Sequence, residues 1–448
     1  MKPIWIAVFS LALLSSPLCT DAQKFQPRSI QFHGNTEYST EELLQAAGLK
    51  SGTLLNYADM NAHSKRLMDS GIFSGLSFKF DGQDLIFNVT MSSDLFPVRL
   101  VNFPFAEGKD LDAKLHTLFP LYHGRVPGED GLREDVRQAL ETMLAAKGLK
   151  ATVQVENAAD PIHKTKVAAV EYSIVSPVVQ LGAVQMDGVS DAFRNAVQGQ
   201  IRDASGRPYR SDRTASDLQQ SLMTFYEDKG HAAARVTLTR SGEAVMGGDK
   251  ILIPYRLNVV EGKVYRMGKV TLPPNTPLTA AEVDAILHPL PGSGQAVKAT
   301  ENALSASLTV QQDDSVRLRA LLAEIVRRYR SKGYVDCTAT PQASFDDATG
   351  LANYTVSVRT GEVYHLGFVR FENVSDKLRA ILTHNWQMMP GDPFNQEYVG
   401  DFILKLKEQE PSLRATLSGV KPVFDVMANP ETHEVNVVLR LERAVPAS

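Results

Sequence analysis

The sequence predicts an α+β protein built as a tandem array of about five strand-helix-helix-strand-strand repeats. Three observations predict this class. A helix end, a Lys-Gly stop and a strand start follow one another at 144–155, 225–236 and 328–339. Apolar residues before each stop recur at three- and four-residue steps, whereas those after it alternate. The 448 residues are too many for one core, and 43% of them are hydrophobic, as in ordinary globular chains.

The clearest repeat covers 177–262 and shows how its first elements are predicted. A strand is expected at 178–186, and a short helical pattern follows at 189–203. The next helix carries Leu218 and Leu222 on one apolar face, because residues four apart lie above one another on a helix. This face needs a sheet to pack against, which the rest of the repeat supplies.

The second half of this repeat contains the stop and two strands. Lys229 suits a helix C-terminus, and Gly230 can adopt the left-handed cap. Alternating apolar and polar residues at 233–239 predict a half-buried strand, and the polar segment 241–250 predicts a turn. Apolar residues on one face of 251–259 predict the last strand.

The same order of elements predicts four further repeats along the chain. We number them repeat 1 at 23–94, repeat 2 at 95–176, repeat 3 at 177–262, repeat 4 at 263–361 and repeat 5 at 362–448. In repeat 2, Gly148 follows Gly124 by 24 residues, and in repeat 3 Gly230 follows Gly206 by the same 24. Equal spacing indicates a second helix of the same length in both repeats.

Two repeats depart from the pattern. Repeat 4 carries extra sequence at 296–315 before its second helix, and repeat 5 ends that helix without a Lys-Gly stop. The joints at 260–270 and 359–369 leave only a glycine-centred bend between repeats. Such short connections predict an extended, jointed rod rather than freely moving domains.

The N-terminus predicts export. An apolar run at 4–14 is long enough for the core of a signal peptide and too short for a membrane span. Thr20 and Ala22 are small enough for cleavage after residue 22, so 1–22 is expected to be removed. The mature chain then keeps Cys337 as its single cysteine, which we interpret as a small buried residue rather than a nucleophile.

Charge and motifs argue against several functions. The formal net charge is -4 and no basic stripe is present, which argues against nucleic acid as a partner. The chain has no phosphate-binding loop, no nucleophile elbow and no H-E-x-x-H zinc motif. Histidines such as His33, His163 and His231 show no ligand-like spacing, so no metal and no cofactor are expected. An exported enzyme that uses unrecognised carboxylates, or a purely structural spacer, stays open as an alternative.

Three recurring motifs resemble those of polypeptide-transport-associated (POTRA) domains from outer-membrane assembly factors of the BamA and TamA type. They are the joints E-G-x-V-Y-x-x-G-x-V, the G-x-P-[YF] before the second helix, and the helix end K-G-[YH]. The resemblance implies a three-stranded mixed sheet with two helices on one face in each repeat. It also implies an arm in the periplasm of a diderm bacterium, associated with the outer membrane. In that family the arm precedes a membrane barrel, whereas only "AVPAS" follows the last predicted strand, so we expect an arm without a barrel.

The resemblance implies a non-catalytic module that binds polypeptides or outer-membrane barrel and assembly proteins, with peripheral membrane association at most. Binding by strand addition at a sheet edge requires little of the partner's sequence. The strand after the Lys-Gly stop is implied to be that edge, which selects Arg235, Val236 and Thr237 in repeat 3 and Val335 and Cys337 in repeat 4. Successive N–H groups point to opposite sides of a strand, so one of Val236 and Thr237 faces outward. The sequence leaves open which one, and the Val236 side chain is expected to pack inward.

Overall fold

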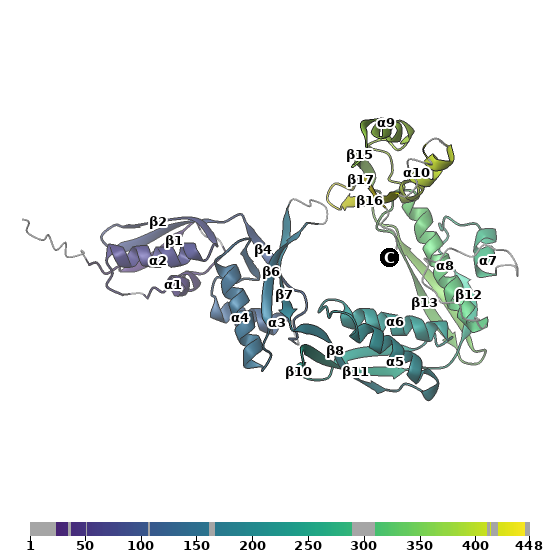
Figure 1. Ribbon diagram of the computed structural model, residues 1–448, viewed down its shortest axis with the longest axis horizontal. Coiled ribbons are helices and arrows are strands. Elements are labelled where there is room, and N and C mark those ends of the chain that lie inside the picture. Colours follow the sequence, from purple (N-terminus) through teal and green to yellow (C-terminus); the bar gives the residue numbers. More distant parts are fainter. Residues whose placement is uncertain are drawn as a thin grey trace, which may run out of the picture. The chain divides into compact units, whose positions relative to one another are not determined.

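The computed structural model describes residues 24–34, 37–50, 52–105, 108–160, 166–288, 310–409, 413 and 420–443. The predicted signal peptide at 1–22 lies outside these residues. Small mixed sheets, each with two helices packed against it, follow one another along the described chain (Figure 1). The predicted α+β class with tandem repeats is confirmed. The chain divides into two compact bodies, of which the first holds most of repeats 1 and 2 and the second holds repeats 3 to 5.

All five sheets share one strand order. The first strand of a repeat pairs in parallel with the last strand, and the strand after the helices pairs antiparallel with that same last strand. The last strand is therefore central. The strand after the second helix lies at an edge in every repeat. No helix among the described residues is long and apolar enough to cross a membrane.

Repeat 1 shows how the helices are fixed locally. Its elements are β1 (Ser29–His33), α1 (Thr40–Ala47), α2 (Tyr57–Asp69), β2 (Phe73–Phe80) and β3 (Asp84–Met91). The Ser39 side chain accepts a hydrogen bond from the Glu42 backbone, and the Glu42 carboxylate accepts one from the Ser39 N–H in return. This capping box sets the start of α1. Leu43, Leu67 and Phe87 are buried between the helices and the sheet.

Repeat 2 contains one strand that the sequence did not predict. Its elements are β4 (Leu95–Leu100), α3 (Gly108–Leu118), β5 (Arg125–Pro127), α4 (Leu132–Ala146), β6 (Thr152–Ala159) and β7 (Val167–Ser176). The extra strand β5 pairs with β4 and has only three residues, too few for an alternating pattern to stand out. The predicted stop of α4 is confirmed, because Gly148 adopts a φ of 76°.

Repeat 3 follows the prediction most closely. Its elements are β8 (Val178–Asp187), α5 (Asp191–Ser205), α6 (Thr214–Asp228), β9 (Arg235–Arg240), β10 (Val245–Gly247) and β11 (Lys250–Val260). Gly230 adopts a φ of 83°, and the His231 N–H donates a hydrogen bond to the Tyr226 carbonyl. Both features are those of the predicted left-handed cap. Ile251 and Leu257 on β11 are fully buried. The predicted turn at 241–250 contains the short strand β10.

In repeat 4, part of the predicted insertion belongs to the second helix. Its elements are β12 (Arg266–Thr271), α7 (Ala280–Leu287), α8 (Val310–Arg330), β13 (Thr338–Asp346) and β14 (Leu351–Arg359). Most of the predicted extra sequence at 296–315 lies outside the described residues. Residues 310–315 belong to α8, so the second helix begins earlier than predicted. Leu321 and Ile325 of α8 are fully buried against the sheet.

Repeat 5 has an aromatic core. Its elements are β15 (His365–Glu372), α9 (Asp376–Asn385), α10 (Gln396–Gln409), β16 (Val420–Asn429) and β17 (Glu434–Arg443). The Trp386 ring lies 4.9 Å from the Phe402 ring and 6.0 Å from the Phe371 ring, centroid to centroid. The Trp386 indole N–H donates to the Met388 carbonyl, so this buried polar group is paired.

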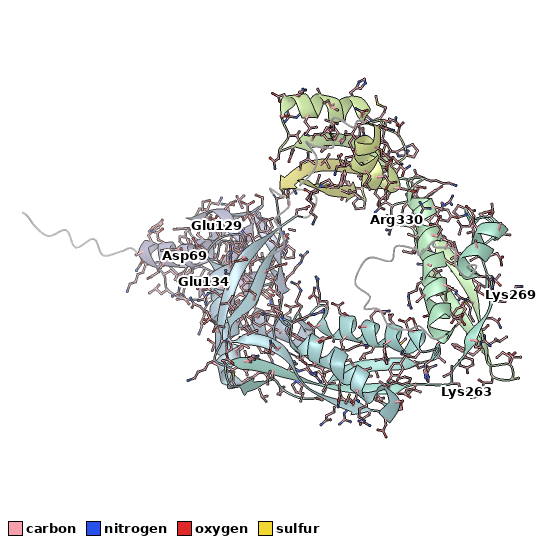
Figure 2. The ribbon with its side chains drawn as sticks, turned by 45° about the vertical axis from the view of Figure 1, so that its right-hand side comes forward. Asp69, Glu129, Glu134, Lys263, Lys269 and Arg330 are labelled. Carbon is pink, nitrogen blue, oxygen red and sulfur yellow. The ribbon has the colours of Figure 1, made fainter. Side chains whose placement is uncertain are left out.

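The Lys-Gly stop also anchors the next repeat. The Gly230 carbonyl accepts a hydrogen bond of 2.8 Å from the Tyr265 N–H, and the Gly333 carbonyl accepts one of 2.8 Å from the Tyr364 N–H. Lys263, labelled in Figure 2, forms an ion pair of 3.1 Å with the Asp347 carboxylate beside the first of these joints. The repeated helix-stop-strand phrase therefore ends a helix and fixes the start of the following repeat.

Truncation of one core side chain should destabilise its own repeat. Leu222 of α6 is fully buried, so Leu222→Ala is expected to cost roughly 2 to 5 kcal/mol through lost burial and the cavity left behind. Leu404 of α10 is 62% exposed, so Leu404→Ala serves as the control, with an expected cost below about 0.5 kcal/mol. Hydrogen exchange followed by mass spectrometry should show lost protection in repeat 3 for Leu222→Ala. An equal loss in repeat 5 would show that the repeats do not unfold independently.

Candidate functional site

The edge strand of repeat 3 carries three of the predicted binding residues. Arg235, Val236 and Thr237 lie at the start of β9, which pairs with β11 and with no other strand of the described chain. Val236 is buried and its two neighbours are exposed, which agrees with the predicted inward packing of this side chain. The backbone edge opposite β11 is the surface to which an extended peptide could add.

The two predicted residues of repeat 4 do not lie on an edge strand. Strand β13 begins at Thr338, whereas Val335 lies in the preceding turn and Cys337 lies between that turn and the strand. The Cys337 side chain is buried, and this burial raises the pKa of its thiol, with the Arg330 charge acting in the opposite direction. The thiol is therefore kept protonated, as suits a small core residue. The prediction placed the strand too early because the turn after Gly333 is longer than the alternating pattern indicated.

The register of β9 and β11 shows which N–H groups face outward. The Ser241 N–H donates to the Pro254 carbonyl directly opposite it, over 3.0 Å. In an antiparallel pair, hydrogen-bonded and non-hydrogen-bonded positions alternate. Thr237, opposite Asn258, is therefore bonded into the sheet, whereas the N–H and C=O of Val236 point to the open edge.

One outward N–H of β9 has a partner from the helix above it. The Leu238 N–H donates to the Gln219 side-chain oxygen of α6 over 3.2 Å. Within the described chain, the outward N–H groups of Val236 and Arg240 have no such partner. A flexible glutamine side chain can move away from the edge, so this single cap does not close it.

The edge strand of repeat 2 is closed in a different way. The Val153 N–H of β6 donates to the Glu141 carboxylate over 2.8 Å, and Arg133 donates to the Val155 carbonyl over 3.1 Å. Arg137 is held in an ion pair with Glu141, and Glu134 pairs with the same guanidinium at 2.6 Å (Glu134 is labelled in Figure 2). Charged side chains of α4 therefore occupy the groups that a peptide would need.

The other strands that follow a second helix carry features that discourage strand addition. Strand β13 contains Pro341 and strand β16 contains Pro422, and proline removes a donor from an edge. Strand β2 has an irregular register next to Gly75 and an exposed Lys79. Strand β9 has none of these devices between its terminal arginines. Among the five strands that follow a second helix, β9 therefore presents the fewest obstacles to an added strand.

Sequence reasoning missed the residues that distinguish these edges. Gln219, Glu141 and Arg133 act on strands that are 12 to 22 residues away in the chain. All three lie on the second helix of their repeat, but no sequence pattern distinguishes them from other polar residues of these helices. The prolines of β13 and β16 were visible in the sequence, but their edge position depended on the strand order.

Tandem α+β modules with a central last strand and exposed edge strands form a recognised class of domain. Residues 27–92 match the family model POTRA, described as surface antigen variable number repeat. Repeat 1 is therefore a POTRA domain, and repeats 2 to 5 show the same strand order. The chain thus has one repeat that matches the POTRA model, followed by four repeats of the same topology.

Several solved structures are similar to this chain at low identity. POTRA domains 3 to 5 of BamA from Haemophilus influenzae are 18% identical, with 60% of this chain and 98% of that chain covered and a TM-score of 0.37. The N-terminal domain of Omp85 from Thermosynechococcus elongatus is 16% identical, with 59% and 97% covered and a TM-score of 0.18. CdiB from Escherichia coli is 16% identical, with 58% and 36% covered and a TM-score of 0.18.

Proposed function

We propose that this protein is an exported, non-catalytic scaffold that binds extended polypeptide segments in the periplasm during outer-membrane protein assembly or secretion. The POTRA match of repeat 1 and the resemblance to assembly-factor arms support this class of function. The observation that carries the binding step is the open backbone edge of β9. Its partners would be unfolded outer-membrane proteins or components of the assembly machinery.

Strand addition at β9 follows from the backbone geometry. The outward N–H and C=O of Val236 offer one donor and one acceptor, and the outward groups of Leu238 and Arg240 continue the row. An added strand would pair with these groups about 4.8 Å from β9. Because main-chain groups supply the affinity, the site would accept many sequences. This suits a scaffold that meets different polypeptides.

A pair of substitutions at Val236 tests the proposed edge. Val236→Pro and Val236→Ala both remove the buried isopropyl group, but only proline removes the outward N–H. Binding of a urea-unfolded outer-membrane barrel protein is expected to weaken about tenfold in Val236→Pro relative to Val236→Ala. Fluorescence anisotropy of the labelled barrel protein, diluted into the full mature chain, measures this difference. Circular dichroism establishes that both variants are folded.

Removal of the cap should have the opposite effect. Gln219→Ala frees the Leu238 N–H without touching β9 itself, so binding is expected to tighten by about two- to fivefold. Equal affinity in Val236→Pro and Val236→Ala, together with no change in Gln219→Ala, would contradict strand addition at β9. Loss of all binding in Val236→Ala alone would instead assign the interaction to side chains.

A further inference from the structure

Three side chains with metal-binding chemistry meet where repeat 1 contacts repeat 2. Glu42 comes from α1, His116 from α3, and His123 from the loop between α3 and β5. The His123 Nε2 atom lies 2.9 Å from Glu42 Oε1, and the His116 Nε2 atom lies 3.5 Å from the same oxygen. One ligand atom from each of the three residues lies within 4.8 Å of the others. The two repeats belong to the same compact body.

The Glu42 carboxylate is oriented by its helix cap. Glu42 Oε2 accepts hydrogen bonds from the Ser39 N–H at 2.7 Å and from the Ser39 hydroxyl at 2.8 Å. This leaves Oε1 directed at the two imidazoles. The two Ser39 donors therefore hold the carboxylate in one orientation.

The His116 ring is oriented by a backbone carbonyl. Its Nδ1 atom lies 3.0 Å from the Tyr122 carbonyl oxygen, which can only accept, so Nδ1 carries the hydrogen. In the neutral ring, Nε2 then carries the lone pair and faces Glu42. The Tyr122 hydroxyl donates to Asp112 at 2.9 Å, which extends the support by one more residue. An outer hydrogen bond of this kind is typical of histidines that bind metals.

The separations fit a small four-coordinate cation. Zinc binds imidazole nitrogen and carboxylate oxygen at about 2.0 to 2.2 Å in tetrahedral geometry, which places the ligand atoms roughly 3.3 to 3.5 Å apart. The His116 Nε2 to Glu42 Oε1 distance of 3.5 Å falls in this range, whereas the His123 Nε2 distance of 2.9 Å is that of a hydrogen bond and would lengthen when an ion binds. Two imidazoles and one carboxylate also favour zinc over calcium or magnesium, because the latter two ions prefer oxygen ligands. Water would take the fourth position, because His116 and His123 are 45% and 36% exposed.

We propose that Glu42, His116 and His123 bind a divalent transition-metal ion, best matched by zinc, which links α1 of repeat 1 to α3 of repeat 2. Glu42 is oriented by Ser39 and His116 by the Tyr122 carbonyl, so two of the three ligands are already held in place. The linked elements are separated by more than sixty positions in the sequence. A bound ion would therefore stiffen this joint.

Metal binding is tested on the full mature chain, purified without a histidine tag and stripped with a chelator. Calorimetric titration with zinc should show one site, and cobalt should give the visible absorption of a tetrahedral site that zinc abolishes. His116→Ala, His123→Ala and Glu42→Gln are each expected to weaken zinc binding at least about tenfold. His288→Ala is the matched control, since His288 lies 3.0 Å from the Asp284 carboxylate but has no third ligand in the described chain. Its zinc affinity should equal that of the parent.

Hydrogen exchange gives a second readout. Zinc should increase protection in both α1 and α3 of the parent chain and in neither helix of His116→Ala. Zinc binding that is unchanged in His116→Ala and His123→Ala would overturn the proposal. So would zinc protection of α1 and α3 that persists in both variants. Either result would show that the three residues do not bind zinc and that Glu42 only forms ion pairs with the two histidines.

Discussion

Thr237→Pro is expected to unfold the edge of repeat 3 and to destabilise that repeat by about 2 to 4 kcal/mol. The Thr237 N–H is bonded into the sheet opposite Asn258, whereas the Thr237 side chain is exposed. Proline deletes this ladder bond, leaves the Asn258 carbonyl without its donor, and restricts the backbone to a φ that differs from that of a strand. Hydrogen exchange followed by mass spectrometry should show lost protection in β9 and β11.

The control at the same position is Thr237→Ala, which keeps the N–H and removes only an exposed side chain. Its cost should stay below about 1 kcal/mol. Proline at Val236 should be tolerated better than proline at Thr237, because the Val236 N–H points to the open edge. If Val236→Pro unfolds repeat 3 while Thr237→Pro does not, the assigned direction of the N–H groups is wrong.

Much of the fold could be predicted from the sequence because its causes are local. The spacing of apolar residues predicted the helices, and Lys229 followed by Gly230 predicted a helix end with a left-handed cap. The short strands β5 and β10 were missed, since three residues are too few to display a period of two. They form because longer neighbours offer unpaired edges, which is a tertiary effect.

The candidate site could be predicted only in part. Alternation indicated that Val236 packs inward, and the structure agrees. The direction of its N–H depends on how β9 aligns with β11, and that register is not contained in the pattern of β9 alone. The same limit applies to the cluster at Glu42, because His116 and His123 show no metal motif until the fold brings α1 against α3.

The edge strands also show that similar repeats need not share a function. The same topology leaves the strand after the second helix unpaired on one side in every repeat, and such an edge can pair wrongly with another chain. Side chains of α4 cover β6, and prolines interrupt β13 and β16. On β9, the Gln219 side chain caps a single outward N–H, that of Leu238. Strand addition is therefore expected to concentrate at repeat 3 rather than to spread evenly along the chain.

Gly188→Ala is expected to destabilise repeat 3 by about 3 to 5 kcal/mol. Gly188 follows β8 with a φ of 75°, and a Cβ atom there would lie 1.9 Å from the Val259 carbonyl oxygen of β11. That carbonyl belongs to the central strand and cannot move without disturbing the pairing of β11. Gly34 has the same relation to the Val89 carbonyl of repeat 1, at 2.3 Å. The close approach is thus a repeated feature of the fold.

Gly248→Ala separates this clash from backbone strain. Gly248 lies in the same repeat with a φ of 69°, but a Cβ atom there meets nothing within 4 Å. Both substitutions restrict the unfolded chain equally and place alanine in the left-handed region, so Gly248→Ala should cost only about 1 kcal/mol. Hydrogen exchange of β11 in urea measures both variants in one repeat. Equal losses of β11 protection in the two variants would contradict the prediction. They would show that the backbone at Val259 moves enough to accept the added methyl group.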